Sequence, residues 1–131
     1  LKKLQSVSTI PDSVSERSRF STAEIAIHPS GKFLYVSNRG HDSISLFGIN
    51  EQSGKLSLKR VEPTHCQTPR HFTIAPGGNR LYAAGQASGT VTAFTIDPTT
   101  GKLSFTNRLT KVPKPVCIIF SRPLSSGPEK P

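Results

Sequence analysis

The chain has 131 residues, of which 34% are hydrophobic and 19% charged, values typical of an ordinary folded domain. Its longest apolar stretch, 116–120, is far shorter than the roughly 20 residues that a membrane-spanning helix needs. The net charge of +9 is scattered along the chain, without a basic stripe or interleaved aromatic residues. We therefore expect neither a membrane nor a nucleic acid as partner.

The first elements in chain order are a strand and a loop. Residues 1–10 alternate apolar and polar side chains, which predicts a strand at 4–10. Residues 11–21 are polar and rich in serine, which predicts a long exposed loop.

Residues 22–64 contain four short segments with period-two alternation and many β-branched or aromatic residues, at 24–28, 33–38, 43–49 and 56–61. Turn sequences separate them, such as Pro29-Ser30-Gly31-Lys32 and Gln52-Ser53-Gly54-Lys55. The turns are too short for a crossover helix, so consecutive strands must pair antiparallel. This stretch therefore predicts one four-stranded antiparallel sheet.

Residues 65–111 repeat that pattern, with strands predicted at 72–75, 80–84, 90–96 and 103–109. Shifted by 47 positions, residues 24–61 align with 71–108 without a gap, and eleven positions are identical. In the first unit these are Ile27, Pro29, Gly31, Leu34, Tyr35, Phe47, Ile49, Gly54, Lys55, Leu56 and Ser57. A four-stranded sheet of this length repeated in tandem is typical of β-propeller blades.

The last elements are a strand predicted within 112–120, where Val116–Phe120 follow two prolines, and a proline-containing disordered tail at 121–131. The fold class predicted is thus all-β. It consists of two tandem four-stranded antiparallel blades of a β-propeller, 22–64 and 65–111. We expect residues 1–10 to be the last strand of a preceding blade and residues 112–120 the first strand of a following one.

The stretch 23–44, AEIAIHPSGKFLYVSNRGHDSI, resembles the bacterial lactonase family of seven-bladed β-propellers, whose named activity is that of 6-phosphogluconolactonase. Residues 68–72 and 112–117 are similar to segments near the C-terminal end of that family. The resemblance covers about residues 4–120 and implies the last third of a longer propeller. We accordingly expect an isolated chain of this length to be weakly stable, to self-associate through exposed blade edges and to lack full activity.

Candidate site residues are the polar positions at which the two repeats differ, because positions that agree are structural by default. In a propeller these positions fall where the innermost strands enter and where the second strands end, near the central channel. The four differences are Glu24 with His71, Ala23 with Arg70, Arg39 with Gln86, and His41 with Ser88.

Lactone hydrolysis needs a base that activates water and a donor that stabilises the carbonyl oxyanion. We assign Glu24 as candidate base, His71 beside it as catalytic candidate, and His41 as a further substrate-contacting candidate. Arg39 and Arg70 are candidate binders of an anionic sugar lactone, because a guanidinium binds phosphate bidentately. The resemblance implies a site here, since Glu24, Arg39 and Arg70 match the family's motif positions.

Each candidate also has a structural interpretation. Glu24 can be a strand-end charge, Arg39 a partner of Asp42, and Arg70 an exposed loop cation. His41 and His71 can serve structure alone, and His28, before a turn proline, is interpreted as structural.

The two cysteines, Cys66 and Cys117, are too few for a disulfide framework or a zinc site, and we interpret them as free thiols. No phosphate-binding loop, nucleotide fingerprint or acidic cluster is visible, so we expect neither cofactor nor metal. The function expected is that of a cytoplasmic lactonase. The alternatives are a non-catalytic propeller that serves binding or scaffolding, as in surface-layer propellers, and a lactone-forming cycloisomerase of the same fold, as in the fungal muconate-lactonising enzymes.

Overall fold

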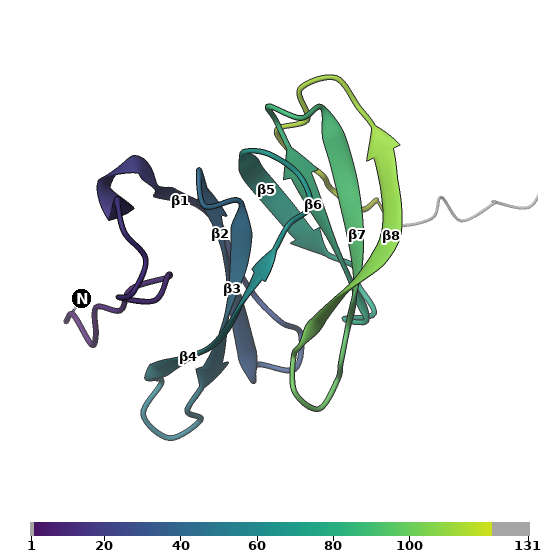
Figure 1. Cartoon of the computed structure of the whole chain (residues 1–131). Coiled ribbons are helices and arrows are strands. Elements are labelled where there is room, and N and C mark those ends of the chain that lie inside the picture. The colour runs from purple at the N-terminus through teal and green to yellow at the C-terminus, as the bar shows by residue number, and fades with distance from the viewer. Residues whose placement is uncertain (1, 122–131) are drawn as a thin grey trace, which may run out of the picture.

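A computed structural model of the chain describes residues 2–121 and shows two four-stranded antiparallel sheets that face each other (Figure 1). The first sheet has the order β1-β2-β3-β4 and the second the order β5-β6-β7-β8. The strands are β1 Ser21–Ile27, β2 Phe33–Arg39, β3 Ser43–Ile49, β4 Leu56–Pro63, β5 Pro69–Ile74, β6 Arg80–Gly85, β7 Thr90–Ile96 and β8 Leu103–Lys111. The all-β fold of two blade-like sheets predicted from the repeat is confirmed.

Equivalent turns join the first two strands of each sheet. Gly31 has φ 73° and donates its N–H to the His28 carbonyl at 2.8 Å. Gly78 has φ 71° and donates in the same way to Ala75 at 2.8 Å. Because L side chains rarely adopt this left-handed backbone, glycine is the residue that closes both turns.

The main core lies between the two sheets. Strand pairing places Tyr35 opposite Leu46, on the face of the first sheet that meets the second, and Leu81 opposite Phe94, on the facing side. The buried cluster consists of Phe33, Tyr35, Ile44, Leu46, Cys66, Phe72, Leu81, Ala83, Phe94, Ile96 and Leu103. Period-two alternation thus gives each sheet one face for this interface.

Two hydrogen bonds fix the sheets against each other. The Tyr35 hydroxyl donates to the Gly101 carbonyl at 2.7 Å, and burial raises the pKa of this tyrosine. His28 Nε2 lies 2.7 Å from the Gly78 carbonyl. Its Nδ1 accepts the Ser30 N–H at 3.1 Å, so Nε2 carries the proton and donates. These bonds confirm that His28 is structural.

The opposite face of the first sheet is covered by the N-terminal segment, which runs along the side away from the second sheet (Figure 1). Leu34, Val36 and Phe47 form a small core there. The Gln5 side chain bonds both backbone groups of Leu56, at 3.0 and 2.8 Å, and the Ser45 hydroxyl donates to the Thr9 carbonyl.

The strand predicted at 4–10 is not formed. Side chains hold this segment against the sheet. Its backbone forms no ladder of hydrogen bonds, because no partner strand lies beside it within residues 2–121. The loop predicted at 11–21 includes a short 3₁₀ helix, Arg17–Arg19, and ends where β1 begins at Ser21.

The strand predicted within 112–120 is likewise not formed. This segment crosses the outer face of the second sheet, where the Phe120 ring lies 5.8 Å from the Tyr82 ring. The tail predicted at 121–131 lies, apart from its first residue, outside the described residues. Within residues 2–121 no helix is long and apolar enough to cross a membrane.

Candidate functional site

The candidate site lies where β1 and β5 run side by side at the junction of the two sheets. Both strands are irregular at equivalent points. The pairing of β1 shifts between Thr22 and Ile25, and that of β5 between Pro69 and His71. Such bulges redirect side chains away from the regular alternation and are common beside functional sites.

Glu24 lies in the irregular part of β1, where three contacts orient it. Its N–H donates to the Ser37 hydroxyl on β2 at 3.0 Å, which replaces the missing ladder bond. Its Oε1 accepts the N–H of Ile25 at 2.9 Å, and its Oε2 lies 3.1 Å from Nε2 of His71. The carboxylate is 30% exposed and its oxygens retain free lone pairs, so it can still accept a proton.

His71 connects this carboxylate to the C-terminal segment. Its Nδ1 accepts the backbone N–H of Ile118 at 3.2 Å, so this nitrogen carries no proton. The proton of the neutral ring therefore lies on Nε2, which donates to Glu24. The imidazole is held from both sides, and its side chain is only 19% exposed.

A cavity of about 440 Å³ opens beside this pair, between β1, β5 and the segment 118–120. Its walls are mainly apolar. They consist of Glu24, Ala26, Ile27, Pro29, His71, Phe72, Thr73, Ile74, Ala75, Pro76, Ile118, Ile119 and Phe120. The two ionisable groups therefore lie at the edge of an open, mainly apolar pocket.

The two arginines lie outside that lining. Arg70 is exposed and occupies the irregular position of β5 directly before His71. Arg39 ends β2 and is half-buried, and its Nε is buried with no hydrogen-bond partner in the described part of the chain. The ion pair of Arg39 with Asp42, one of the structural interpretations, is not formed within residues 2–121.

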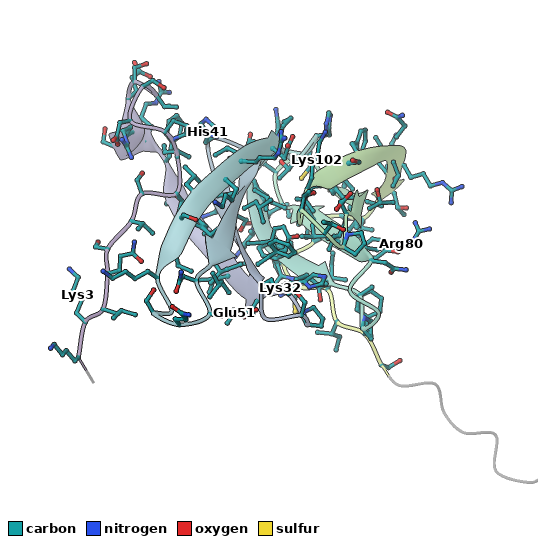
Figure 2. All side chains as sticks on the ribbon, turned by 90° about the horizontal axis from the view of Figure 1, so that it is seen from below. Lys3, Lys32, His41, Glu51, Arg80 and Lys102 are labelled. Carbon is teal, nitrogen blue, oxygen red and sulfur yellow. The ribbon has the colours of Figure 1, made fainter. Side chains whose placement is uncertain are left out.

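His41 lies in the turn between β2 and β3, at the periphery in Figure 2. Its Nδ1 lies 2.7 Å from the Ser43 hydroxyl, and its ring meets Phe20 edge-on with 5.4 Å between the centroids. These contacts are structural. The structure thus brings together Glu24 and His71, with Arg70 adjacent in sequence, and places neither Arg39 nor His41 at the cavity.

Sequence reasoning missed two residues that contact the pair, Ser37 and Ile118. Ser37 carried a signal, because it also breaks the repeat, in which the aligned residue is Ala84. Ile118 acts through its backbone, and no side-chain pattern could have revealed it.

The charges of the chain do not collect around the cavity. Lys3, Lys32, Arg80 and Lys102 are spread around the molecule in Figure 2. Across residues 2–121, no three His, Cys, Asp or Glu side chains come close enough to hold a metal ion.

Comparison with known proteins places this geometry in context. The family described as "Lactonase, 7-bladed beta-propeller" matches residues 1–120. A 6-phosphogluconolactonase of Formosa agariphila is 51% identical over 57 residues, which are 42% of this chain and 16% of that protein. A 6-phosphogluconolactonase of Bacillus subtilis is 41% identical over 71 residues, 54% of this chain and 20% of that protein.

Among solved structures, a putative 6-phosphogluconolactonase of Bacteroides uniformis is similar with a TM-score of 0.71 and 37% identity. The match covers 73% of this chain and 28% of that protein. The matches therefore span only 16% to 28% of the length of these relatives.

Proposed function

Because the chain belongs to the seven-bladed lactonase β-propeller family, we propose that its two blades contribute a catalytic pair to the hydrolysis of a sugar lactone. The observation that carries this proposal is the contact between Glu24 and His71, 3.1 Å apart across the junction of the blades. The two residues occupy equivalent positions of the repeat, Glu24 in the first blade and His71 in the second.

In the proposed reaction Glu24 is the general base. A water molecule in the cavity gives a proton to the carboxylate, and its oxygen attacks the lactone carbonyl carbon. The tetrahedral intermediate then collapses, the bond from the carbonyl carbon to the ring oxygen breaks, and the ring oxygen takes the proton from Glu24. The product is the open hydroxy acid, and Glu24 returns to its starting state.

His71 is better suited to orient Glu24 than to act as the base itself. Its Nδ1 is occupied by the Ile118 N–H, and its Nε2 already carries a proton. Donation from Nε2 fixes the orientation of the carboxylate.

For the substrate we propose a lactone with an anionic group, and specifically a phosphorylated one such as 6-phosphogluconolactone. The names of the relatives support this class. Arg70, exposed beside His71, can reach an anion at the mouth of the cavity. Arg39 lies outside the cavity, so Arg70 is the arginine proposed to meet this anion.

The test is lactone hydrolysis by this chain and by the chain joined to the other blades of a full-length relative, with spontaneous hydrolysis subtracted. We expect Glu24→Gln to lower kcat by about 100-fold or more, the usual contribution of a general base. Glu51→Gln, an exposed glutamate in a turn, is the matched control and should leave kcat unchanged. A folded Glu24→Gln protein with the parent rate would contradict the role of Glu24.

The arginines are tested by comparing a phosphorylated lactone with the same lactone lacking phosphate. Arg70→Ala should raise KM mainly for the phosphorylated substrate, whereas Arg108→Ala, an exposed arginine on β8, should change neither. If no lactone is opened by the well-folded, completed protein, the blades belong to a binding protein or to an enzyme that runs the reaction in the lactone-forming direction.

Two further properties stay proposals. We propose a cytoplasmic location, which two unpaired cysteines support. We also propose that the chain on its own self-associates, because apolar side chains such as Ile25, Ile27 and Ile119 are exposed on its outer surfaces. Sedimentation of the purified chain over a range of concentrations tests the second proposal, and a monomer at all concentrations would contradict it.

A further inference from the structure

Asp42 ties the turn after β2 to the linker that leads into β5. Its Oδ1 accepts the N–H of Thr68 at 2.9 Å and that of Gly40 at 3.2 Å. Its carbonyl oxygen accepts both the N–H and the hydroxyl of Thr64, at 2.9 and 2.8 Å. One half-buried residue of the first blade thus holds both ends of the linker between the blades.

The residue that the carboxylate holds, Thr68, is in an unfavourable backbone conformation. Its φ is 56°, in the left-handed region that β-branched residues rarely adopt. Such a conformation persists only where surrounding contacts impose it, and it is common at functional sites. The bond from the Thr68 N–H to Asp42 is one such contact.

The course of the chain after Thr68 determines where the site residues lie. The Thr68 carbonyl accepts the N–H of Arg70 at 2.7 Å, which closes a three-residue turn around Pro69. Arg70 then occupies the irregular position of β5, and His71 resumes the pairing opposite Ala84. The orientation of Thr68 therefore fixes the direction in which Arg70 and His71 leave the turn.

The second blade supplies an internal control for this arrangement. The position equivalent to Asp42 is Gly89. Both residues have a left-handed backbone, and φ of Gly89 is 63°. Its carbonyl accepts the N–H of Val112 at 2.9 Å, just as the Asp42 carbonyl accepts that of Thr64. The backbone bond is thus common to both blades, and the carboxylate is an addition found only where the linker leads to Arg70 and His71.

We propose that Asp42 is a positioning residue, whose carboxylate holds Thr68 and thereby sets His71 against Glu24. Its effect on catalysis rests on the proposed function, but its effect on His71 does not. The role is separate from blade stability, because the equivalent turn of the second blade forms with glycine in its place.

The experiment compares Asp42→Gly with Asp42→Asn in the whole chain. Glycine suits the left-handed backbone and keeps the carbonyl bonds, so it removes only the carboxylate. Asparagine keeps an acceptor oxygen at the same place. Asp97→Gly is the matched control, because Asp97 also accepts two backbone N–H groups, those of Thr99 and Thr100, but in the distant β7–β8 turn.

The first readout is the pair of ring ¹⁵N chemical shifts of His71, which distinguish a ring held as the Nε2–H tautomer from one that exchanges. We expect two well-separated shifts in the parent, in Asp42→Asn and in Asp97→Gly. In Asp42→Gly they should move toward a common average. Parent-like His71 shifts in Asp42→Gly would overturn the proposal, and so would unfolding of this variant, since the carboxylate would then serve stability.

The second readout is lactone hydrolysis by the chain completed with the blades of a relative. Asp42→Gly should lower kcat roughly tenfold or more, since small displacements of catalytic groups are costly, and Asp42→Asn should restore most of the rate. The double variant Asp42→Gly, Thr68→Gly should recover part of the loss, because glycine adopts the left-handed conformation unaided. An inactive parent would count against the proposed function alone, whereas an active parent with unaffected Asp42→Gly kinetics would count against the role of Asp42.

Discussion

The two blades share one sequence repeat, yet the same positions meet different surroundings. In the second blade the positions of one face pack against the first blade, and Phe72 is 1% exposed. In the first blade the corresponding face meets only the N-terminal segment, and Ile25, the equivalent of Phe72, is 59% exposed. Burial therefore differs strongly at this position of the first strand, whereas Phe47 and its equivalent Phe94 are both buried.

This difference separates what the repeat encodes from what the junction of the blades adds. The strand order and antiparallel pairing are the same in both units, and equivalent strands differ by at most one residue in length, so these features follow from the repeated residues. The buried hydroxyl of Tyr35 and the contact of Glu24 with His71 occur only where one blade meets the other. Substitutions at equivalent positions of the two blades measure how much the junction adds.

The largest difference is expected between Phe72→Ala and Ile25→Ala. Truncation of a fully buried phenylalanine should lower the free energy of unfolding by about 3–5 kcal/mol, through lost transfer energy and the cavity left behind. Ile25→Ala should cost less than about 1 kcal/mol, because most of its side chain already contacts water. Urea denaturation of both variants measures this, and equal losses would mean that the outer face of the first blade is covered in solution.

A smaller difference is expected between Gly101→Ala and Gly54→Ala. Both glycines are left-handed, with φ 72° and 68°, so either substitution should cost about 1 kcal/mol through backbone strain. At Gly101 an added Cβ would also come within 2.8 Å of the Phe33 ring of the other blade, whereas at Gly54 the nearest atom is 3.6 Å away.

The clash adds about 1–3 kcal/mol to the cost at position 101, as overpacking does in other cores. Differential scanning calorimetry would show the larger decrease in Tm for Gly101→Ala. A decrease of the same size in both variants would mean that Phe33 yields freely and that the junction is loosely packed.

The fold of each blade could be predicted from the sequence because the signals for its strands and turns lie within short stretches of the chain. Period-two alternation and the Pro-Ser-Gly turn specify strands within one blade, and a gapless repeat shows that the unit recurs. The flanking strands expected at 4–10 and 116–120 are not formed in this chain, because a strand depends on a ladder partner that alternation alone does not supply.

The site was predicted in part for a related reason. Breaks in the repeat identified Glu24 and His71, which contact each other. The same criterion also selected His41, which instead contacts Ser43 and Phe20. Asp42 broke the repeat as well and was passed over as a partner for Arg39. A polar residue that breaks the repeat can serve either catalysis or the structure of a turn. Which of the two it serves depends on the direction of its side chain. Bulges change that direction in ways that the spacing of residues does not reveal.

A modest difference is expected between Tyr35→Phe and Tyr82→Phe. The first substitution leaves the Gly101 carbonyl without its buried donor and should cost about 1–2 kcal/mol. Tyr82, at the equivalent position, faces the 112–120 segment and is only half-buried, so its loss should fall within about 0.5 kcal/mol. Equal costs in urea denaturation would show that the hydroxyl bond between the blades contributes nothing.

Tyr35 should also make stability depend on pH in alkaline solution. Burial raises its pKa above the ordinary value of 10.0, so above about pH 10 the unfolded chain loses this proton while the folded chain keeps it. The free energy of unfolding should therefore fall as the pH rises beyond 10. Tyr35→Phe should fall less steeply over the same range, and parallel curves would contradict the contribution of this phenol.

The smallest expected effect leaves stability unchanged and concerns the two thiols. Cys66 lies buried at the junction of the blades, and burial raises the pKa of its thiol, whereas Cys117 is exposed on the segment that crosses the second blade. Because the thiolate is the reacting form, Cys117 should react with a maleimide well before Cys66. In Cys117→Ser only the slow phase should remain, and urea should accelerate it by opening the junction. A Cys66 that reacts as fast as Cys117 without urea would mean that the two blades separate readily, and the burial that distinguishes them would then be transient.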